Sequence, residues 1–221
     1  MQVLCGPNYA SLVGSFREGG ADRLQIITDF DETLTTFTGG DGKRGLQCHD
    51  IVLRFVDTSA PGLREDIAPL QAWNEMSEAQ KVEHCEGSHE ERRLRSRWFF
   101  STFQQVSAKY ELWRQVPDCI ARSNTLTRPG LPHMFRLAGD FNIPLLIVSA
   151  GLEQFIASVF GRGSVDLPGR AALVSNDMAS PEVRVTSRSK ADVAGTLARE
   201  HLGAAAREGR RNVLVLGDKP Q

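Results

Sequence analysis

The sequence lacks any excess of charge of one sign. It carries 26 basic and 27 acidic side chains among 221 residues, for a formal net charge of −1 at pH 7. A chain with so balanced a charge has no overall field that would attract DNA, RNA or an anionic membrane. We therefore expect no nucleic-acid partner, and any phosphate in a substrate has to be held by a local site.

Long apolar runs and paired cysteines are also missing. No run reaches the roughly 20 apolar residues that a membrane span needs, and the first residues have no basic segment followed by an apolar one. The chain has neither a C-x-x-C pair nor a cysteine and histidine cluster at zinc-ligand spacing; its cysteines are Cys5, Cys48, Cys85 and Cys119. We expect free or buried thiols in a cytoplasmic, monomeric protein with no membrane partner.

Four short apolar segments are typical of buried strands in a parallel sheet. They are rich in Ile, Val and Leu and end at turn-forming or acidic residues; they are 24–30, 143–151, 171–176 and 212–218. Segments with apolar residues at helical spacing lie between the later strands, over 152–160 and 190–209. This alternation predicts an α/β fold with a doubly wound parallel sheet and right-handed crossovers.

The segment between the first two predicted strands breaks this alternation. Residues 38–125 contain no convincing buried strand, but they hold all three tryptophans and charged stretches such as SHEERRLRSRW. We expect a mostly helical domain inserted over 38–125, with the core formed by 1–37 and 126–221. The sequence RPGLP at 128–132 indicates a helix start where the chain returns to the core.

Two carboxylates follow the first predicted strand, in IITDFDETLTTF. Asp29 ends the strand, and Asp31 comes two residues later. Open α/β sheets bind ligands at the carboxyl ends of central strands, and two like charges this close cost stability unless a cation or a reaction uses them. A D-x-D sequence also occurs in solvated turns and calcium loops, but a calcium loop needs further oxygen ligands, which the next residues do not supply: Phe30, Leu34 and Phe37.

The sequence DFDETLT is similar to the D-x-D-x-T-[LV] signature of the haloacid dehalogenase superfamily of phosphatases. Further stretches resemble one branch of it, the cytosolic type III pyrimidine 5′-nucleotidases, which include the 7-methylguanosine-phosphate nucleotidases; these stretches are REGGADRLQIITDFDETLTTF, GKRGLQCHDI and FNIPLLIVSAG. The resemblance runs from about residue 16 to the end and is strongest over 16–51 and 128–151. It implies a haloacid-dehalogenase-like fold with a helical cap, and hydrolysis of a nucleoside monophosphate.

The resemblance assigns the chemistry to acidic residues. Asp29 would be the nucleophile that attacks phosphorus and forms an aspartyl-phosphate. Asp31 would be the general acid that protonates the leaving 5′-oxygen, and then the base that activates water. Mg²⁺ would be held by Asp29 and the main-chain carbonyl of Asp31, with Asp218 as a further ligand.

The resemblance also implies how the phosphate is bound. Thr33 belongs to the same motif as the two aspartates. Ser149, in IVSAG, would donate a hydrogen bond to a phosphate oxygen, with the main-chain N–H groups of Ala150 and Gly151 nearby. Lys190 would neutralise the aspartate and phosphate assembly. Lys219 is the alternative, but it adjoins an expected metal ligand, where a cation would compete with Mg²⁺.

The family's cap helix carries residues that contact the base, and RWFFSTF aligns with it. Trp98 and Phe103 can stack on a base. The alternative is that both rings pack inside the cap's own core, and the sequence does not separate the two interpretations. Arg97 stands where the family commonly has a glutamate, and Phe103 where it often has a histidine, so base preference does not carry over.

Two other functions compete with a nucleotidase. One is a phosphatase of the same superfamily that acts on another small phosphomonoester such as phosphoserine. The other is a non-catalytic relative that binds a nucleotide or a protein.

In the family the last strand ends in G-D-x-x-x-D, and the second aspartate would fall one residue beyond Gln221. We therefore expect an incomplete nucleotidase with weakened Mg²⁺ affinity and an uncovered strand edge at 213–216.

Overall fold

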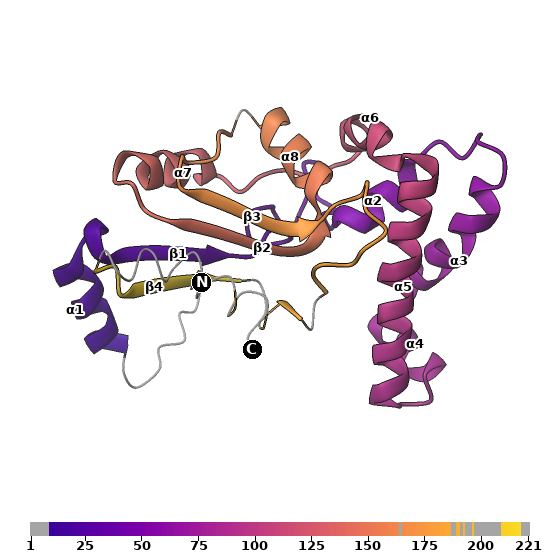
Figure 1. The fold of residues 1–221 in the computed structure, drawn as a ribbon, viewed down its shortest axis with the longest axis horizontal. Coiled ribbons are helices and arrows are strands. Elements are labelled where there is room, and N and C mark those ends of the chain that lie inside the picture. Colours follow the sequence, from indigo (N-terminus) through magenta and orange to yellow (C-terminus); the bar gives the residue numbers. More distant parts are fainter. Residues whose placement is uncertain are drawn as a thin grey trace.

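The structure is a computed structural model, and it describes residues 9–163, 165–186, 189–190, 192, 196 and 209–217 (Figure 1). The first part of the chain contains α1 (Tyr9–Gly19), β1 (Leu24–Thr28), α2 (Cys48–Phe55), α3 (Leu63–Glu75), α4 (Glu78–His84), α5 (His89–Tyr110) and α6 (Val116–Ala121). The second part contains α7 (Leu131–Asp140), β2 (Leu145–Leu152), α8 (Glu153–Arg162), β3 (Ala171–Asn176) and β4 (Asn212–Leu216). Short 3₁₀ helices lie at Ala21–Arg23 and Leu112–Gln115.

The strands of the described residues form one parallel sheet in the order β3-β2-β1-β4. Thr28, the last residue of β1, lies in register with Ile147 of β2 and Leu216 of β4. The chain therefore runs outward from β1 to β3 and returns to β4 on the other side of β1. A ligand is expected at this change of direction, beyond the carboxyl end of β1. The predicted α/β class and parallel sheet are confirmed.

Helices α7 and α8 lie on the same side of the sheet (Figure 1). Helix α7 begins after Gly130, which has a φ of 89°, and a proline occupies its first turn, so the predicted helix start is confirmed. Strand β2 is buried along nearly its whole length, as a central strand of a parallel sheet requires. The predicted helix over 190–209 lies largely outside the described residues. Among the helices that the structure does describe, none has the length and apolar character to cross a membrane.

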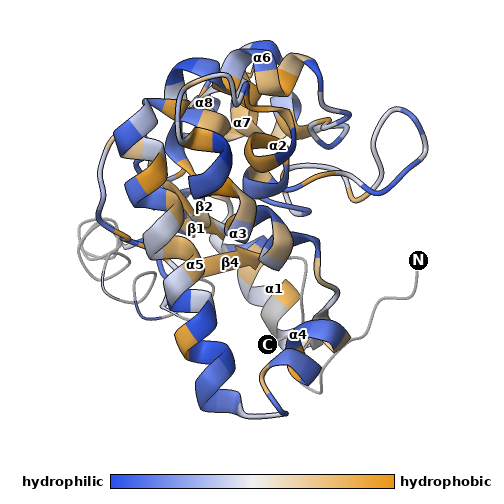
Figure 2. Cartoon of the chain, turned by 90° about the vertical axis from the view of Figure 1, so that its right-hand side faces the viewer, coloured by the Kyte–Doolittle hydropathy of each residue, from blue (hydrophilic) through white to orange (hydrophobic). Residues whose placement is uncertain are grey.

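Helices α2 to α6 fall within the predicted insert, and α3, α4 and α5 lie beyond the carboxyl ends of the strands (Figure 1). In Figure 2, α4 and the neighbouring end of α5 are hydrophilic, whereas the sheet and the elements around it are largely apolar. Helix α2 packs against β2, and α6 packs against α8. Ile51 and Phe103 of the insert belong to the same buried cluster as Ile147 and Phe155. The insert and the sheet thus share one hydrophobic core, and the domain boundaries stay a prediction.

Strand β4 forms one edge of the sheet as the structure describes it. Val213, Leu214 and Val215 are 39%, 38% and 62% exposed. These values contrast with Leu145, Leu146 and Ile147 in β2, which are at most 1% exposed.

Candidate active site

The first aspartate of the motif lies directly after the central strand. The main-chain N–H of Asp29 donates to the carbonyl of Leu216 at 3.1 Å, which continues the pairing of β1 with β4. Asp29 Oδ1 accepts a hydrogen bond from the main-chain N–H of Phe30 at 2.6 Å and forms an ion pair with Lys190 Nζ. The Asp29 carboxylate is thus held by the main chain of the next residue and paired with a lysine, and its side chain is 19% exposed.

Lys190 is held by the residues before it. Its main-chain N–H donates to the carbonyl of Thr186 at 3.0 Å. Thr186 and Ser189 exchange hydrogen bonds, from the N–H of Thr186 to Ser189 Oγ at 2.8 Å and from the N–H of Ser189 to Thr186 Oγ1 at 3.1 Å. The structure therefore brings Lys190 to Asp29, and its catalytic role stays a prediction. The rival Lys219 lies outside the described residues.

Asn176, at the end of β3, fixes the loop that leads to Lys190. Its amide nitrogen donates to the carbonyls of Ala150 at 3.0 Å and Val185 at 2.7 Å. Its amide oxygen accepts from the N–H groups of Arg184 at 2.8 Å and Val185 at 2.9 Å. The Asn176 side chain, which is 1% exposed, therefore connects the ends of β2 and β3 to the part of the loop at Arg184 and Val185. Sequence reasoning missed it, because a single Asn at a strand end is an ordinary turn residue.

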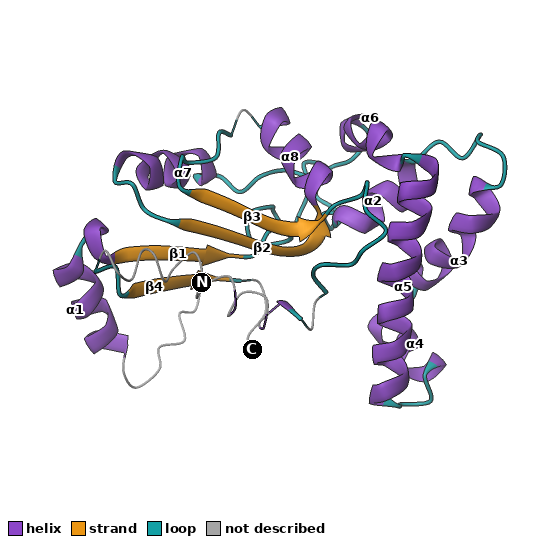
Figure 3. Cartoon of the chain, viewed as in Figure 1, coloured by secondary structure: helices purple, strands orange, loops and turns teal. Residues whose placement is uncertain are grey.

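The same loop is attached to the insert. After β3 the chain runs out to α5 and then turns back (Figure 3). Gln104 Nε2 on α5 donates to the carbonyl of Asp177 at 3.1 Å, and Ser107 Oγ donates to the carbonyl of Met178 at 3.0 Å. Both side chains are buried, so these hydrogen bonds are shielded from water.

Asp31 is partly buried and contacts the first residue of α2. Its Oδ1 accepts hydrogen bonds from the main-chain N–H of Cys48 at 3.3 Å and from Cys48 Sγ at 3.4 Å. The pKa of Asp31 is raised from 3.8 to about 7: burial is the main cause, the charge of Asp29 adds to it, and the Cys48 hydrogen bonds and the charge of Lys190 oppose it. Burial also raises the pKa of the Cys48 thiol well above its usual range, so that Sγ keeps its proton and remains a donor.

Ser149 and Gly151, at the end of β2, lie close to Asp31. Ser149 is 1% exposed, and its Oγ accepts the N–H of Gly151 at 3.0 Å, which leaves the hydroxyl hydrogen available for a phosphate oxygen. A Cβ atom at Gly151 would lie 2.6 Å from Cys48 Sγ, 3.0 Å from Ser149 Oγ and 3.3 Å from Asp31 Oδ2. Only glycine fits there without displacing one of the three side chains.

The loop after Asp31 is held by Arg128, which sequence reasoning also missed. Its guanidinium donates to the carbonyls of Thr33 at 2.7 Å and Glu32 at 2.6 Å. Thr33 Oγ1 is buried and has no hydrogen-bond partner among the described residues, so it is a candidate to bind a ligand. A cavity of about 490 Å³ opens here, lined by Glu32–Leu34, Arg128–Leu131, Met134 and Val215–Gly217.

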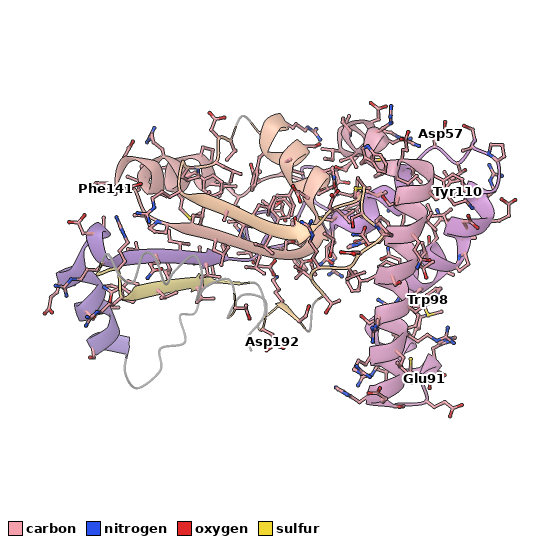
Figure 4. All side chains as sticks on the ribbon, viewed as in Figure 1. Asp57, Glu91, Trp98, Tyr110, Phe141 and Asp192 are labelled. Carbon is pink, nitrogen blue, oxygen red and sulfur yellow. The ribbon has the colours of Figure 1, made fainter. Side chains whose placement is uncertain are left out.

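The aromatic residues predicted to contact a base lie on α5. Phe103 is 1% exposed, and its ring centroid is 4.8 Å from that of His49 and 6.4 Å from that of Phe99. The structure thus places Phe103 in the core, in agreement with the packing alternative. Trp98, labelled in Figure 4, is partly buried against the same core, and Arg97 is exposed.

The donor set at the strand ends suits a hard cation. Mg²⁺ binds oxygen and usually takes one or two carboxylates while keeping several waters. Asp29 and Asp31 supply carboxylate and carbonyl oxygens at one strand end, and their like charges are close enough to raise the pKa of Asp31. Within the described residues there is no group of three or more His, Cys, Asp or Glu side chains that could hold a metal. Asp218, the remaining predicted ligand, lies outside those residues and stays a prediction.

A parallel sheet, a D-x-D loop after its central strand and a helical insert beyond the strand ends together define a protein of the haloacid dehalogenase type. A sequence model of the pyrimidine 5′-nucleotidase (UMPH-1) family matches residues 32–219, and the chain belongs to this family. The resemblance read from the motifs, and with it the expectation of an enzyme family, is therefore confirmed.

Relatives and a solved structure agree with this assignment. The 7-methylguanosine phosphate-specific 5′-nucleotidase of Homo sapiens is 28% identical over 219 residues, which cover 94% of this chain and 69% of the relative. The protein of the same name in Gallus gallus is 22% identical over 218 residues, covering 94% of this chain and 72% of the relative. The crystal structure of cytosolic 5′-nucleotidase IIIB bound to cytidine has a TM-score of 0.56 and 20% sequence identity. That match covers 77% of this chain and 56% of the solved chain, and it supports the fold.

Proposed function

We propose that this protein is a Mg²⁺-dependent 5′-nucleotidase that hydrolyses nucleoside 5′-monophosphates to nucleoside and phosphate. The observation that carries the proposal is the pairing of Lys190 with Asp29, beside the partly buried carboxyl of Asp31, at the carboxyl end of the central strand. The names of the relatives support a nucleotide as the substrate. We further propose a cytoplasmic monomer, in keeping with the cytosolic nucleotidase that shares the fold.

In the first step Asp29 attacks the phosphorus atom. Lys190 and the N–H of Phe30 contact Oδ1, so we assign the attack to Oδ2. The bond between phosphorus and the 5′-oxygen breaks, and an aspartyl-phosphate forms on Asp29. Asp31 gives its proton to the leaving 5′-oxygen, which becomes the nucleoside hydroxyl. Lys190 offsets the negative charge of the phosphoryl group, and the Ser149 hydroxyl donates to one of its oxygens.

In the second step Asp31, now ionised, takes a proton from water. The hydroxide oxygen attacks the phosphorus of the aspartyl-phosphate, phosphate leaves, and both carboxyl groups return to their first states. A pKa near 7 makes both forms of Asp31 accessible at neutral pH, as this double use requires. A bound Mg²⁺ would supply further positive charge against the transferring phosphoryl group. Asp29 and the carbonyl of Asp31 are the described groups that would hold it.

The test is phosphate release from CMP, UMP, 7-methyl-GMP and phosphoserine, with Mg²⁺ and with EDTA. We expect hydrolysis of at least one nucleotide, loss of it in EDTA, and a fall of at least roughly 10³-fold in Asp29→Asn. Asp22→Asn is the matched control, because Asp22 is an exposed carboxylate away from the site. Turnover of phosphoserine alone would favour the small-metabolite phosphatase, and unchanged turnover in Asp29→Asn would show that Asp29 is not the nucleophile.

A further inference from the structure

The buried thiol of Cys48 has no role in the chemistry described above, yet it is placed against the general acid. Its Sγ and its main-chain N–H both donate to the same atom, Asp31 Oδ1, at 3.4 Å and 3.3 Å. Cys48 is 0% exposed, so neither hydrogen bond competes with water. The other carboxyl oxygen, Oδ2, is turned towards Gly151 and therefore towards the end of β2.

The position of Cys48 is itself fixed by the start of α2. The N–H of Gln47 donates to Asp50 Oδ2 at 3.0 Å, and the Gln47 side chain accepts from the N–H of Asp50 in return, which forms a capping box. Asn74 on α3 donates to the other oxygen of Asp50 at 2.7 Å. The first turn of α2 is thereby held, and its first N–H group, that of Cys48, remains for Asp31.

The absence of a side chain at residue 151 completes this arrangement. A Cβ there would lie 2.6 Å from Cys48 Sγ, so the sulfur packs directly on the Cα of Gly151. The carboxyl group of Asp31 contacts both groups, the thiol through Oδ1 and the end of β2 through Oδ2. Its torsion angles are thus restrained by groups from two elements that are distant in the sequence.

We propose that Cys48 is a positioning residue for Asp31: its thiol and N–H hold Oδ1, so that Oδ2 is presented to the leaving oxygen of the substrate. This inference rests on the proposed function, since it needs Asp31 to be the general acid. Cys48 does not touch the substrate and acts only through Asp31. Removing its thiol should impair proton transfer to the leaving group more than it impairs the attack by Asp29.

Two substrates separate these steps. The 5′-oxygen of a nucleotide is a poor leaving group and needs a proton, whereas p-nitrophenolate is a stable anion and leaves with little help from an acid. We compare kcat/KM for CMP, or for 7-methyl-GMP if that is the better substrate, with kcat/KM for p-nitrophenyl phosphate in each variant, because kcat/KM covers the attack by Asp29 and the departure of the leaving group but not the later hydrolysis of the aspartyl-phosphate, which both substrates share. The ratio of the two kcat/KM values does not depend on how much of the protein is folded.

The variants are Cys48→Ala, Cys48→Ser and the matched control Cys119→Ala, which removes another buried thiol from the same core. We expect Cys48→Ala to lower the ratio of the kcat/KM values about tenfold, a part of the roughly 10²–10⁴-fold that general acid catalysis contributes. Cys48→Ser keeps a donor and should restore most of the ratio, and Cys119→Ala should leave it unchanged.

An equal fall on both substrates in Cys48→Ala, or a Cys48→Ser variant as impaired as Cys48→Ala, would overturn the inference and leave the nucleotidase proposal intact. A wild-type chain that hydrolyses neither substrate would overturn both.

Discussion

His49 makes the stability of the protein depend on pH in a way that can be calculated. Its ring lies among three phenylalanines, with centroid distances of 4.8 Å to Phe103, 5.3 Å to Phe100 and 5.6 Å to Phe99. Burial lowers the pKa of His49 from 6.5 to about 4, and the neighbouring carboxylate of Asp50 offsets only part of this effect. The rings come from α2 and α5, so His49 belongs to the contact between these helices.

The sign follows from which state takes up the proton. Between pH 6.5 and pH 4 the unfolded chain binds a proton at His49 that the folded chain excludes. The free energy of unfolding therefore falls as the pH drops below 6.5, by up to roughly 1.4 kcal/mol per pH unit from this group. Between pH 7 and pH 5 His49 alone lowers the free energy of unfolding by about 2 kcal/mol. This is a large share of the roughly 5–15 kcal/mol by which a typical domain is stable.

The assay is urea unfolding followed by tryptophan fluorescence at pH 7 and pH 5. His49→Phe keeps an aromatic ring in the cluster and removes the titration, so it should lose about 2 kcal/mol less than the wild type over this range. His133→Gln, which removes an exposed imidazole on α7, should behave as the wild type does. Equal losses for His49→Phe and the wild type would refute the reasoning.

Three further predictions concern the site. Lys190→Met should lower kcat roughly 10²–10³-fold, because it removes the cation paired with Asp29. The control Lys43→Met, at an exposed lysine, should leave kcat unchanged. Steady-state kinetics measure both variants, and a fall of less than about twofold in Lys190→Met would contradict the role of Lys190. Gly151→Ala should lower the free energy of unfolding by about 1–3 kcal/mol and impair turnover, because of its 2.6 Å contact with Cys48 Sγ. Gly139→Ala, where a Cβ meets nothing within 4 Å, is its control, and equal behaviour of the two would contradict this packing. Asn176→Ala should expose the segment 177–186 to limited proteolysis and lower kcat, because it removes the hydrogen bonds to Ala150, Arg184 and Val185. Unchanged cleavage would show that other contacts hold this segment.

The strands could be predicted well because parallel strands buried on both faces form short runs of Ile, Val and Leu. The expected segments 24–30, 143–151, 171–176 and 212–218 correspond to Leu24–Thr28, Leu145–Leu152, Ala171–Asn176 and Asn212–Leu216. The ends differ by up to two residues. The start of α7 was equally clear, because Gly130 and the prolines around it act through local backbone geometry alone.

The site could be predicted only where the family motifs carry it. Asp29, Asp31, Ser149 and Lys190 were proposed through the resemblance. The structure places the first three at the ends of β1 and β2 and pairs Lys190 with Asp29. The supporting residues depend on contacts between distant positions: Cys48 lies 17 residues from Asp31, Asn176 lies 26 from Ala150, and Arg128 lies 95 from Thr33. No local pattern encodes such pairs. The position of Phe103 was open for the same reason, because its burial depends on how α5 packs against α2.

The hydrogen bonds from α5 to the loop after β3 have a consequence for the pair formed by Lys190 and Asp29. Gln104 and Ser107 donate hydrogen bonds to the carbonyls of Asp177 and Met178. The same segment of the chain continues towards Lys190, which pairs with Asp29. A movement of this part of α5 away from the sheet would pull on the segment that delivers the lysine to Asp29. We therefore expect a displacement of α5 to weaken the ion pair between Lys190 and Asp29.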